Sequence, residues 1–189
     1  MNGTSPTVRF LVLVAAEAAV LVPAAGCAAL AAEKQDFTVD GLLSVGRVGS
    51  VQISPDGKLV AYVVSTPELG KNSVTGHIWL VPAAGGEPRQ LTNHPKGEGA
   101  PAWSPDSRQI AFVSARDGKP QLWRIPVDGG EAVQVTSLST GASSPEWSPD
   151  GKLIAFTSEV WPGVPGGDAG QKKKAEEVEA SGVKARIVD

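Results

Sequence analysis

Few residues of this sequence have the types and the spacing that chemistry would need. The 189 residues include two histidines, His77 and His94, and a single cysteine, Cys27. One cysteine excludes an internal disulfide and any cysteine-based zinc cluster, and two histidines exclude most histidine-rich metal sites. Neither histidine has a serine and an acid at a recognisable spacing, so we interpret each as a strand-edge or loop residue. The sequence therefore predicts no catalytic residue, no metal ligand and no cofactor.

Two strings resemble functional motifs without completing them. Residues 141–145 (Gly-Ala-Ser-Ser-Pro) lack the final glycine of a Gly-x-Ser-x-Gly nucleophile elbow. Residues 97–102 resemble a dinucleotide fingerprint, but Pro101 and the turn that follows it forbid the helix which that motif requires. Neither string therefore predicts a nucleophile or a nucleotide site.

Three aspartates recur in the same short context. Asp56, Asp106 and Asp150 each end a Ser-Pro-Asp sequence, and they are spaced 50 and then 44 residues apart. In such a turn the proline presets φ, the aspartate bonds the nearby backbone, and a following glycine accepts a positive φ. Because each aspartate belongs to a separate unit, we interpret them as turn residues rather than as metal ligands.

The turns belong to a longer sequence repeat, which sets the positions of the strands around them. Trp79 and Trp123 are 44 residues apart, and so are Thr92 and Thr136. A period of about 44 residues lies in the range of β-propeller blades. The first unit has six extra residues, which we place in a lengthened polar loop over residues 66–73.

Each unit has the pattern of four antiparallel strands. One strand leads into Ser-Pro-Asp, a short apolar run follows it, a third strand contains the tryptophan, and a Gly-Gly hairpin leads to the last strand. The sequence therefore predicts an all-β fold, an incomplete β-propeller of about three blades over residues 48–160. Closed propellers have about 4 to 8 blades. We expect this chain to be the front part of a longer protein, and a ring made of several copies is the alternative. The oligomeric state is left open.

The N-terminus has the pattern of an export signal. An apolar run over residues 10–25 follows Arg9, and small residues then lead to a polar stretch. We expect a signal peptide over residues 1–31, cleaved after Ala31, a leader segment over 32–47, and a secreted or periplasmic protein. Lipoprotein processing at Cys27 and a membrane anchor are the alternatives.

The C-terminal part, residues 161–189, breaks the repeat. A Gly/Pro loop comes first, and a charged helix over 171–180 follows, with Asp168 as its N-cap and Gly182 as its stop. The last residues, 183–189, have an extended pattern and read as a truncated inter-blade segment. Acidic residues balance the lysines, and the net charge is −3, so nucleic acid is not an expected partner.

The repeat resembles a known family. Trp-Ser-Pro-Asp-Gly-Lys-Leu-Ile-Ala-Phe, which ends at Phe156, is similar to the TolB-type propeller repeat (WD40-like, PD40). Residues 36–57 resemble the start of the propeller in serine peptidases of the prolyl oligopeptidase family (S9), in the secreted dipeptidyl-peptidase and acylaminoacyl-peptidase branch. Residues 158–186 are similar to an inter-blade insertion of that branch, which often has a cysteine pair that this chain lacks.

This resemblance implies a function by association. In that family the propeller lies over an α/β-hydrolase domain, restricts its active site to small peptides, and contains none of the catalytic Ser, Asp and His. The expected function is thus the non-catalytic, substrate-gating part of a secreted serine peptidase, with peptides as partners. Propeller acids of the family often bind the free amine of the substrate, and Glu159 lies near such a region but is not assigned that role. The alternative is a TolB-like periplasmic propeller that acts as a protein-interaction module.

Overall fold

The computed structural model describes residues 38–181 of the chain. The chain divides into two units, Met1–Thr38 and Val39–Asp189, and the described residues belong almost wholly to the second. The predicted signal peptide, its cleavage position, Cys27, Gly182 and the segment 183–189 lie outside the described residues. Within the described part, no helix is long and apolar enough to cross a membrane.

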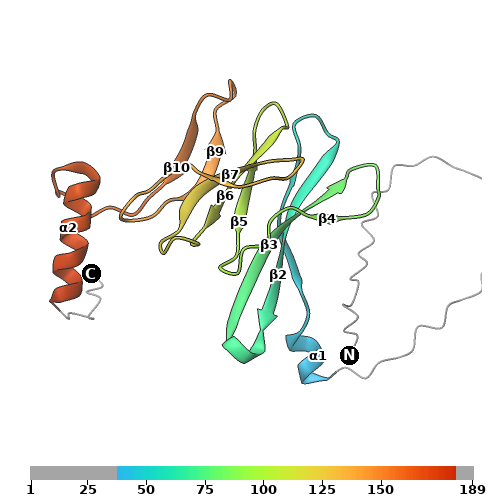
Figure 1. The fold of residues 1–189 in the computed structure, drawn as a ribbon, viewed down its shortest axis with the longest axis horizontal. Helices are drawn as coiled ribbons and strands as arrows, with labels where there is room; N and C mark the ends of the chain where they lie inside the picture. The colour runs from blue at the N-terminus through green and yellow to red at the C-terminus, as the bar shows by residue number, and fades with distance from the viewer. Residues whose placement is uncertain (1–37, 182–189) are drawn as a thin grey trace, which may run out of the picture. The chain divides into compact units, whose positions relative to one another are not determined.

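Two four-stranded antiparallel sheets form the centre of the described chain (Figure 1). In each sheet the strands lie in the order in which they occur in the sequence. The first sheet contains β1 (Arg47–Ile53), β2 (Leu59–Glu68), β3 (Ser73–Pro82) and β4 (Arg89–Gln90). The second sheet contains β5 (Gly99–Trp103), β6 (Gln109–Ser114), β7 (Gln121–Pro126) and β8 (Val133–Gln134). The prediction of an incomplete β-propeller with four strands per unit is therefore confirmed for two blades.

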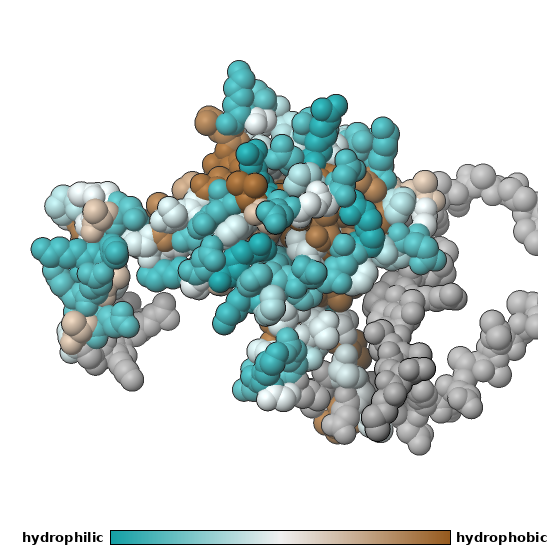
Figure 2. All heavy atoms as spheres, in the orientation of Figure 1, coloured by the Kyte–Doolittle hydropathy of each residue, from teal (hydrophilic) through white to brown (hydrophobic). Residues whose placement is uncertain are grey.

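The third unit has two strands in the described part. They are β9 (Ser143–Trp147) and β10 (Ile154–Thr157), which pair antiparallel. Apolar side chains remain at the surface here, since Leu153 is 71% exposed and Phe156 is 41% exposed. Figure 2 shows apolar residues, in brown, at the surface of the described blades. These exposed apolar residues agree with a propeller whose described blades do not close into a ring.

The short helices differ from the sequence-based expectation. The helix α1 (Val39–Leu43), within the leader, and the 3₁₀ turn Leu69–Lys71 were not predicted. The helix α2 (Gly167–Ala180) is present, but it begins four residues before the expected start. Its N-cap is Gly166, at φ 92°, and no side chain caps it. The prediction of Asp168 as N-cap is thus wrong, because this carboxylate bonds to Ser139 instead.

The prediction of a loop over residues 66–73 is also wrong. The strands β2 and β3 pair without a register shift from Leu59↔Pro82 to Glu68↔Ser73, so the six extra residues lengthen a hairpin. Glu68 stabilises its tip by accepting hydrogen bonds from Thr75 Oγ1 at 2.8 Å and Lys71 Nζ at 2.5 Å. Cross-strand pairs of this kind outweigh the polar composition that suggested a loop.

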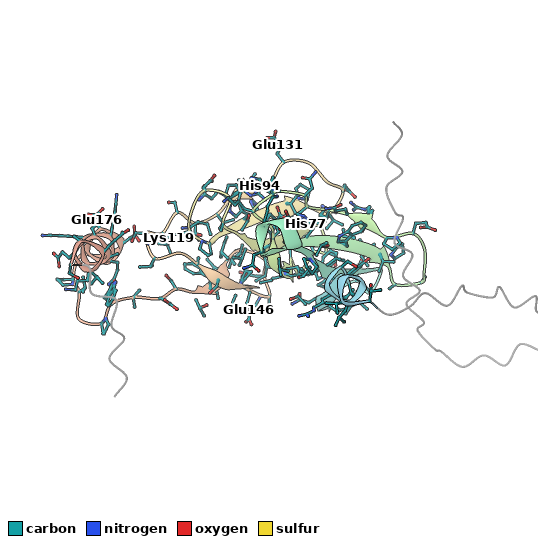
Figure 3. All side chains as sticks on the ribbon, turned by 90° about the horizontal axis from the view of Figure 1, so that it is seen from below. His77, His94, Lys119, Glu131, Glu146 and Glu176 are labelled. Carbon is teal, nitrogen blue, oxygen red and sulfur yellow. The ribbon has the colours of Figure 1, made fainter. Side chains whose placement is uncertain are left out.

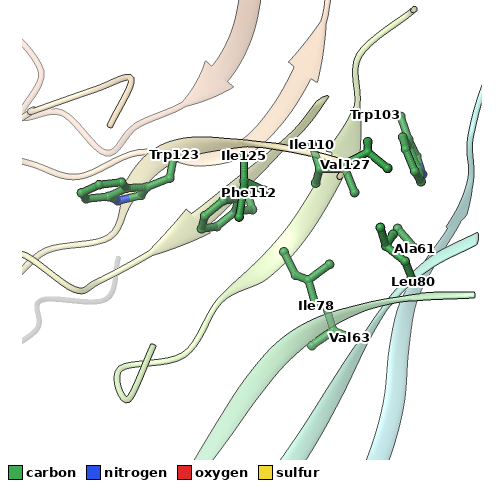
Figure 4. Close-up of a cluster of buried hydrophobic side chains, with 10 residues drawn as sticks. All are labelled: Ala61, Val63, Ile78, Leu80, Trp103, Ile110, Phe112, Trp123, Ile125 and Val127. Atoms are coloured by element: carbon green, nitrogen blue, oxygen red, sulfur yellow. The ribbon is translucent and has the colours of Figure 1, made fainter. Parts of the chain in front are cut away.

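The core lies between the first two blades, as Figure 4 shows. Paired residues of β2 and β3 face paired residues of β6 and β7, and the register puts each pair on one face of its sheet. The cluster contains Ala61, Val63, Ile78 and Leu80 from the first blade, and Trp103, Ile110, Phe112, Trp123, Ile125 and Val127 from the second.

A tryptophan links each blade to the one before it. Trp103 Nε1 donates a hydrogen bond to the Gln52 carbonyl at 3.2 Å, and Trp147 Nε1 donates to the Ala102 carbonyl at 3.2 Å. The first unit has Ile53 at this position, and its side chain is 62% exposed. Trp103 is therefore both a core residue and a hydrogen-bond donor between neighbouring inner strands, and the half-buried Trp147 repeats the hydrogen bond.

Candidate functional site

The structure places the three repeated aspartates in the turns that the sequence predicts. Asp56, Asp106 and Asp150 each accept the hydroxyl of the serine two positions earlier, at 2.6 Å. Each also accepts the backbone N–H two positions later, and these two bonds, the hydroxyl first, lower the pKa of each aspartate. Each carboxylate is thus already engaged within its own turn.

Charged residues that the sequence analysis did not connect meet between the first two blades. The Glu98 carboxylate is fully buried. Its Oε2 lies 2.9 Å from Nδ1 of His77, and its Oε1 accepts a hydrogen bond from Arg116 Nη2 at 3.0 Å and from the backbone N–H of His94 at 3.0 Å. We call these four residues the Glu98 cluster. It joins β3, the loop after β4 and the loop after β6.

The local backbone brings Glu98 to this position. Its N–H donates to the Gly76 carbonyl at 2.7 Å, and the Gly97 N–H donates to the His94 carbonyl at 2.8 Å. Gly97 has φ 77°, and a Cβ on it would lie 3.2 Å from the Gly76 carbonyl oxygen. A larger residue at Gly97 would therefore be strained at this φ and would press on the Gly76 backbone, which holds the Glu98 N–H.

The guanidinium of Arg116 is fixed by aromatic rings as well as by Glu98. It lies 4.5 Å from the centre of the Trp123 ring and 5.6 Å from that of Phe112, and its Nε lies 3.3 Å from Ser114 Oγ. Stacking on tryptophan is the strongest form of this cation–π contact. Burial of a carboxylate is costly unless it is paired and hydrogen-bonded, and here both oxygens are engaged.

The cluster has a pairing of acid and histidine but no nucleophile. Within residues 38–181 no serine hydroxyl bonds to His77, and Ser114 Oγ donates to the Gly97 carbonyl at 2.9 Å. The chemistry that this arrangement supports is an ionic connection between two blades rather than acyl transfer.

A cavity of about 340 Å³ opens beside the cluster. In Figure 3, His94 and Glu131 lie toward one edge of the described blades, and Glu146 lies toward the opposite edge. Residues of both blades and their loops line the cavity: Leu91, Thr92, Asn93, His94, Glu98, Arg116, Ile125, Gly130, Glu131 and Ala132.

The inner strands β1, β5 and β9 line a second cavity, of about 480 Å³. Each of these strands has an irregular register at one point, where Ser50, Ala100 and Ser144 adopt φ of 49°, 49° and 51°. Glu146 is the one charged residue among the residues that line it. This surface is built from equivalent residues of all three units.

The other residues that the sequence singled out lie apart from the Glu98 cluster. Ser143 of the elbow-like string lies in β9, and its hydroxyl bonds to Thr157 Oγ1 at 2.8 Å. Glu159 and Trp161 line a cavity of about 300 Å³ next to α2. Sequence reasoning missed Glu98 and Arg116, although the repeat offered a signal: Ala142 and Val160 stand 44 residues later.

The sequence of this chain is similar to that of known proteins. The family model of the TolB β-propeller domain matches residues 43–161. Dipeptidyl-peptidase 5 of Porphyromonas gingivalis is 35% identical over 88 residues, which is 47% of this chain and 13% of that protein. The uncharacterized peptidase YuxL of Bacillus subtilis is 36% identical over 85 residues, which is 45% of this chain and 13% of that protein.

Among solved structures, an acylaminoacyl peptidase of Pyrococcus horikoshii superposes with a TM-score of 0.54 at 19% identity. The superposition covers 66% of this chain and 19% of that one. The aligned region is thus a small share of each of these longer proteins, and its fold is the one described above.

Proposed function

Because this chain belongs to the TolB β-propeller domain family, we propose that it forms the non-catalytic propeller part of a secreted serine peptidase. The observation that carries this proposal is the 35–36% identity of its repeats to two proteins named as peptidases. The chain spans about an eighth of the length of these relatives, so the peptidase reaction is proposed for the whole protein.

In this proposal the propeller residues control the access of peptides to the catalytic site of the whole protein. In the whole protein a serine hydroxyl would attack a peptide carbonyl, the C–N bond would break, and the amine fragment would leave with a proton, which gives an acyl-enzyme ester. Water would then hydrolyse this ester, which releases the carboxylic acid fragment and restores the serine. The inner strands offer a mostly uncharged surface, with Glu146 as its one charged residue, past which a peptide would travel. The Glu98 cluster would hold the first two blades together during that passage.

The proposal is tested on the protein as the cell makes it. An antibody raised against residues 38–181 would recover the native protein, which is then treated with a fluorophosphonate that labels active serines. We expect a labelled protein that hydrolyses dipeptidyl arylamides, and an unlabelled recombinant chain of residues 32–189. A recovered protein without label or hydrolysis would contradict the proposal and favour a propeller that only binds other proteins.

Export is a separate part of the proposal, and it rests on the residue pattern alone. We propose that residues 1–31 are removed after Ala31 during secretion. N-terminal sequencing of the protein recovered outside the cytoplasm would then begin at Ala32. A mature N-terminus at Cys27 with a lipid attached would contradict this and identify a lipoprotein.

A further inference from the structure

The helix α2 lies on the rest of the molecule through polar contacts. Its one buried residue is Gln171, and none of its side chains belongs to the hydrophobic cluster of Figure 4. An isolated helix of 14 residues is only marginally stable in water, so these contacts also decide whether α2 stays helical.

The first contact joins α2 to the loop after β8. Asp168 Oδ1 accepts hydrogen bonds from the backbone N–H of Ser139 at 2.7 Å and from its hydroxyl at 2.8 Å. The same two bonds hold the pKa of Asp168 below its ordinary value, with smaller contributions from Lys172 and Lys119. Lys119 also donates to the Ser139 carbonyl, so the loop is held from two directions.

The second contact joins α2 to the segment that follows β10. The side-chain amide of Gln171 accepts the Trp161 N–H at 2.6 Å and donates to the Trp161 carbonyl at 3.2 Å. A single side chain thus satisfies both backbone groups of Trp161, as a neighbouring strand would. We call the Asp168–Ser139 and Gln171–Trp161 contacts the two latches.

The segment between Trp161 and α2 has a tightly turned backbone that depends on glycine. Gly163, Gly166 and Gly167 adopt φ of 73°, 92° and 58°, a region that other residues rarely enter. Gly170, in the first turn, lies so close to the Pro165 carbonyl that a Cβ there would overlap it. The folded linker therefore needs glycine within it, and α2 needs glycine at position 170.

Two cavities have α2 as one wall. One, of about 480 Å³, lies between α2 and the loops of the second blade, and Asp168, Lys172 and Glu176 line it together with Lys119 and Gln121. The other, of about 300 Å³, is lined by Ala175 of α2 and by Thr140 and Trp161.

We propose that α2 is a lid that the two latches hold closed and that swings about linker 162–166 to open both cavities. Polar latches suit this role because water replaces their hydrogen bonds on opening, so that closed and open states differ little in free energy. An apolar contact surface would instead be exposed to water on opening.

Hydrogen exchange on the full chain tests the lid. The double variant Ser139→Ala/Gln171→Ala weakens both latches, and alanine at residue 171 favours the helix itself. We expect amides of α2 to exchange at least tenfold faster than in the unchanged chain, while amides of β2, β3, β6 and β7 keep their rates. The control is Glu176→Ala, on the same helix but in neither latch, which leaves exchange in α2 within twofold.

A chemical probe tests the opening of the cavity. Thr140→Cys in a Cys27→Ala background places a single thiol beside Trp161. Its maleimide reaction is expected to be at least fivefold faster when the double latch variant is added. Unchanged exchange and unchanged labelling would overturn the lid, and so would equal acceleration of exchange in the blades, which indicates general unfolding.

Discussion

Two junctions between neighbouring units can be compared: the one between the first two blades, and the one between the second blade and the third unit. They share the same pattern of backbone hydrogen bonds but differ in their side chains. In both, a backbone N–H reaches the preceding blade: Glu98 donates to Gly76, and Ala142 donates to Pro120. In both, a threonine accepts the N–H of the third strand, with Thr92 paired to Ile78 and Thr136 paired to Leu122.

The difference lies in how the connecting loop is held. At the first junction the His94 N–H is satisfied by the buried Glu98 carboxylate, which also pairs with Arg116 and lies 2.9 Å from His77 Nδ1. At the second, the equivalent Leu138 N–H is satisfied by the neutral amide of Gln121, which stands at the position of His77.

The comparison shows that the equivalent loop N–H can be bound by a charged carboxylate in one unit and by a neutral amide in the next. Removal of a neutral amide leaves uncharged backbone groups unpaired. A buried charge leaves its partner uncompensated when it is removed. The two junctions therefore differ in how severely a single substitution damages them.

The largest expected effect comes from Glu98→Ala. The change leaves Arg116 largely buried without a carboxylate, and it removes the acceptor of the His94 N–H. We expect a loss of about 3–5 kcal/mol in the free energy of unfolding, measured by urea denaturation. A loss below about 1 kcal/mol would show that the cluster does not hold the blades together.

The next effect comes from replacing the first junction with the residues of the second. The triple variant His77→Gln/Glu98→Ala/Arg116→Val removes the carboxylate and the guanidinium of the cluster together, along with the His77 imidazole. Because no uncompensated charge remains, we expect it to be more stable than Glu98→Ala alone by about 2 kcal/mol. If the triple variant is instead the less stable of the two, the remaining side chains of the cluster stabilise the fold even without the Glu98 carboxylate.

A smaller effect is expected at the second junction. Gln121→Ala removes the amide that accepts the Leu138 N–H at 3.1 Å and donates to the Leu138 carbonyl at 2.6 Å. We expect a loss of about 1–3 kcal/mol in the same urea experiment, less than for Glu98→Ala. Equal losses at both sites would remove the distinction between a charged and a neutral junction.

The smallest effect concerns the turns, which are alike in all three units. The Ser104 hydroxyl lowers the pKa of Asp106 in the folded chain below the ordinary 3.8, so its stabilisation is present above that value and is lost as pH falls through the folded pKa. Between pH 5 and pH 3 the melting temperature of the Asp106→Asn variant is expected to fall less than that of the unchanged chain. Identical slopes would mean that this turn does not contribute to the acid sensitivity.

The sequence by itself determined the all-β fold, the period of the repeat and the role of the three aspartates. These features depend on contacts within a few residues, such as the 2.6 Å bond from Ser54 to Asp56, and a local pattern is enough to predict them. The strands of the two complete blades follow from the same short patterns.

Only the tertiary structure decided the Glu98 cluster and the docking of α2. Glu98 and Arg116 are 18 residues apart, and Ser139 and Asp168 are 29 residues apart. Such pairs form because blade packing brings separate loops together, and no local pattern records which loops will meet. For the same reason Asp168, which has the residue type of a helix cap, bonds to a distant serine instead.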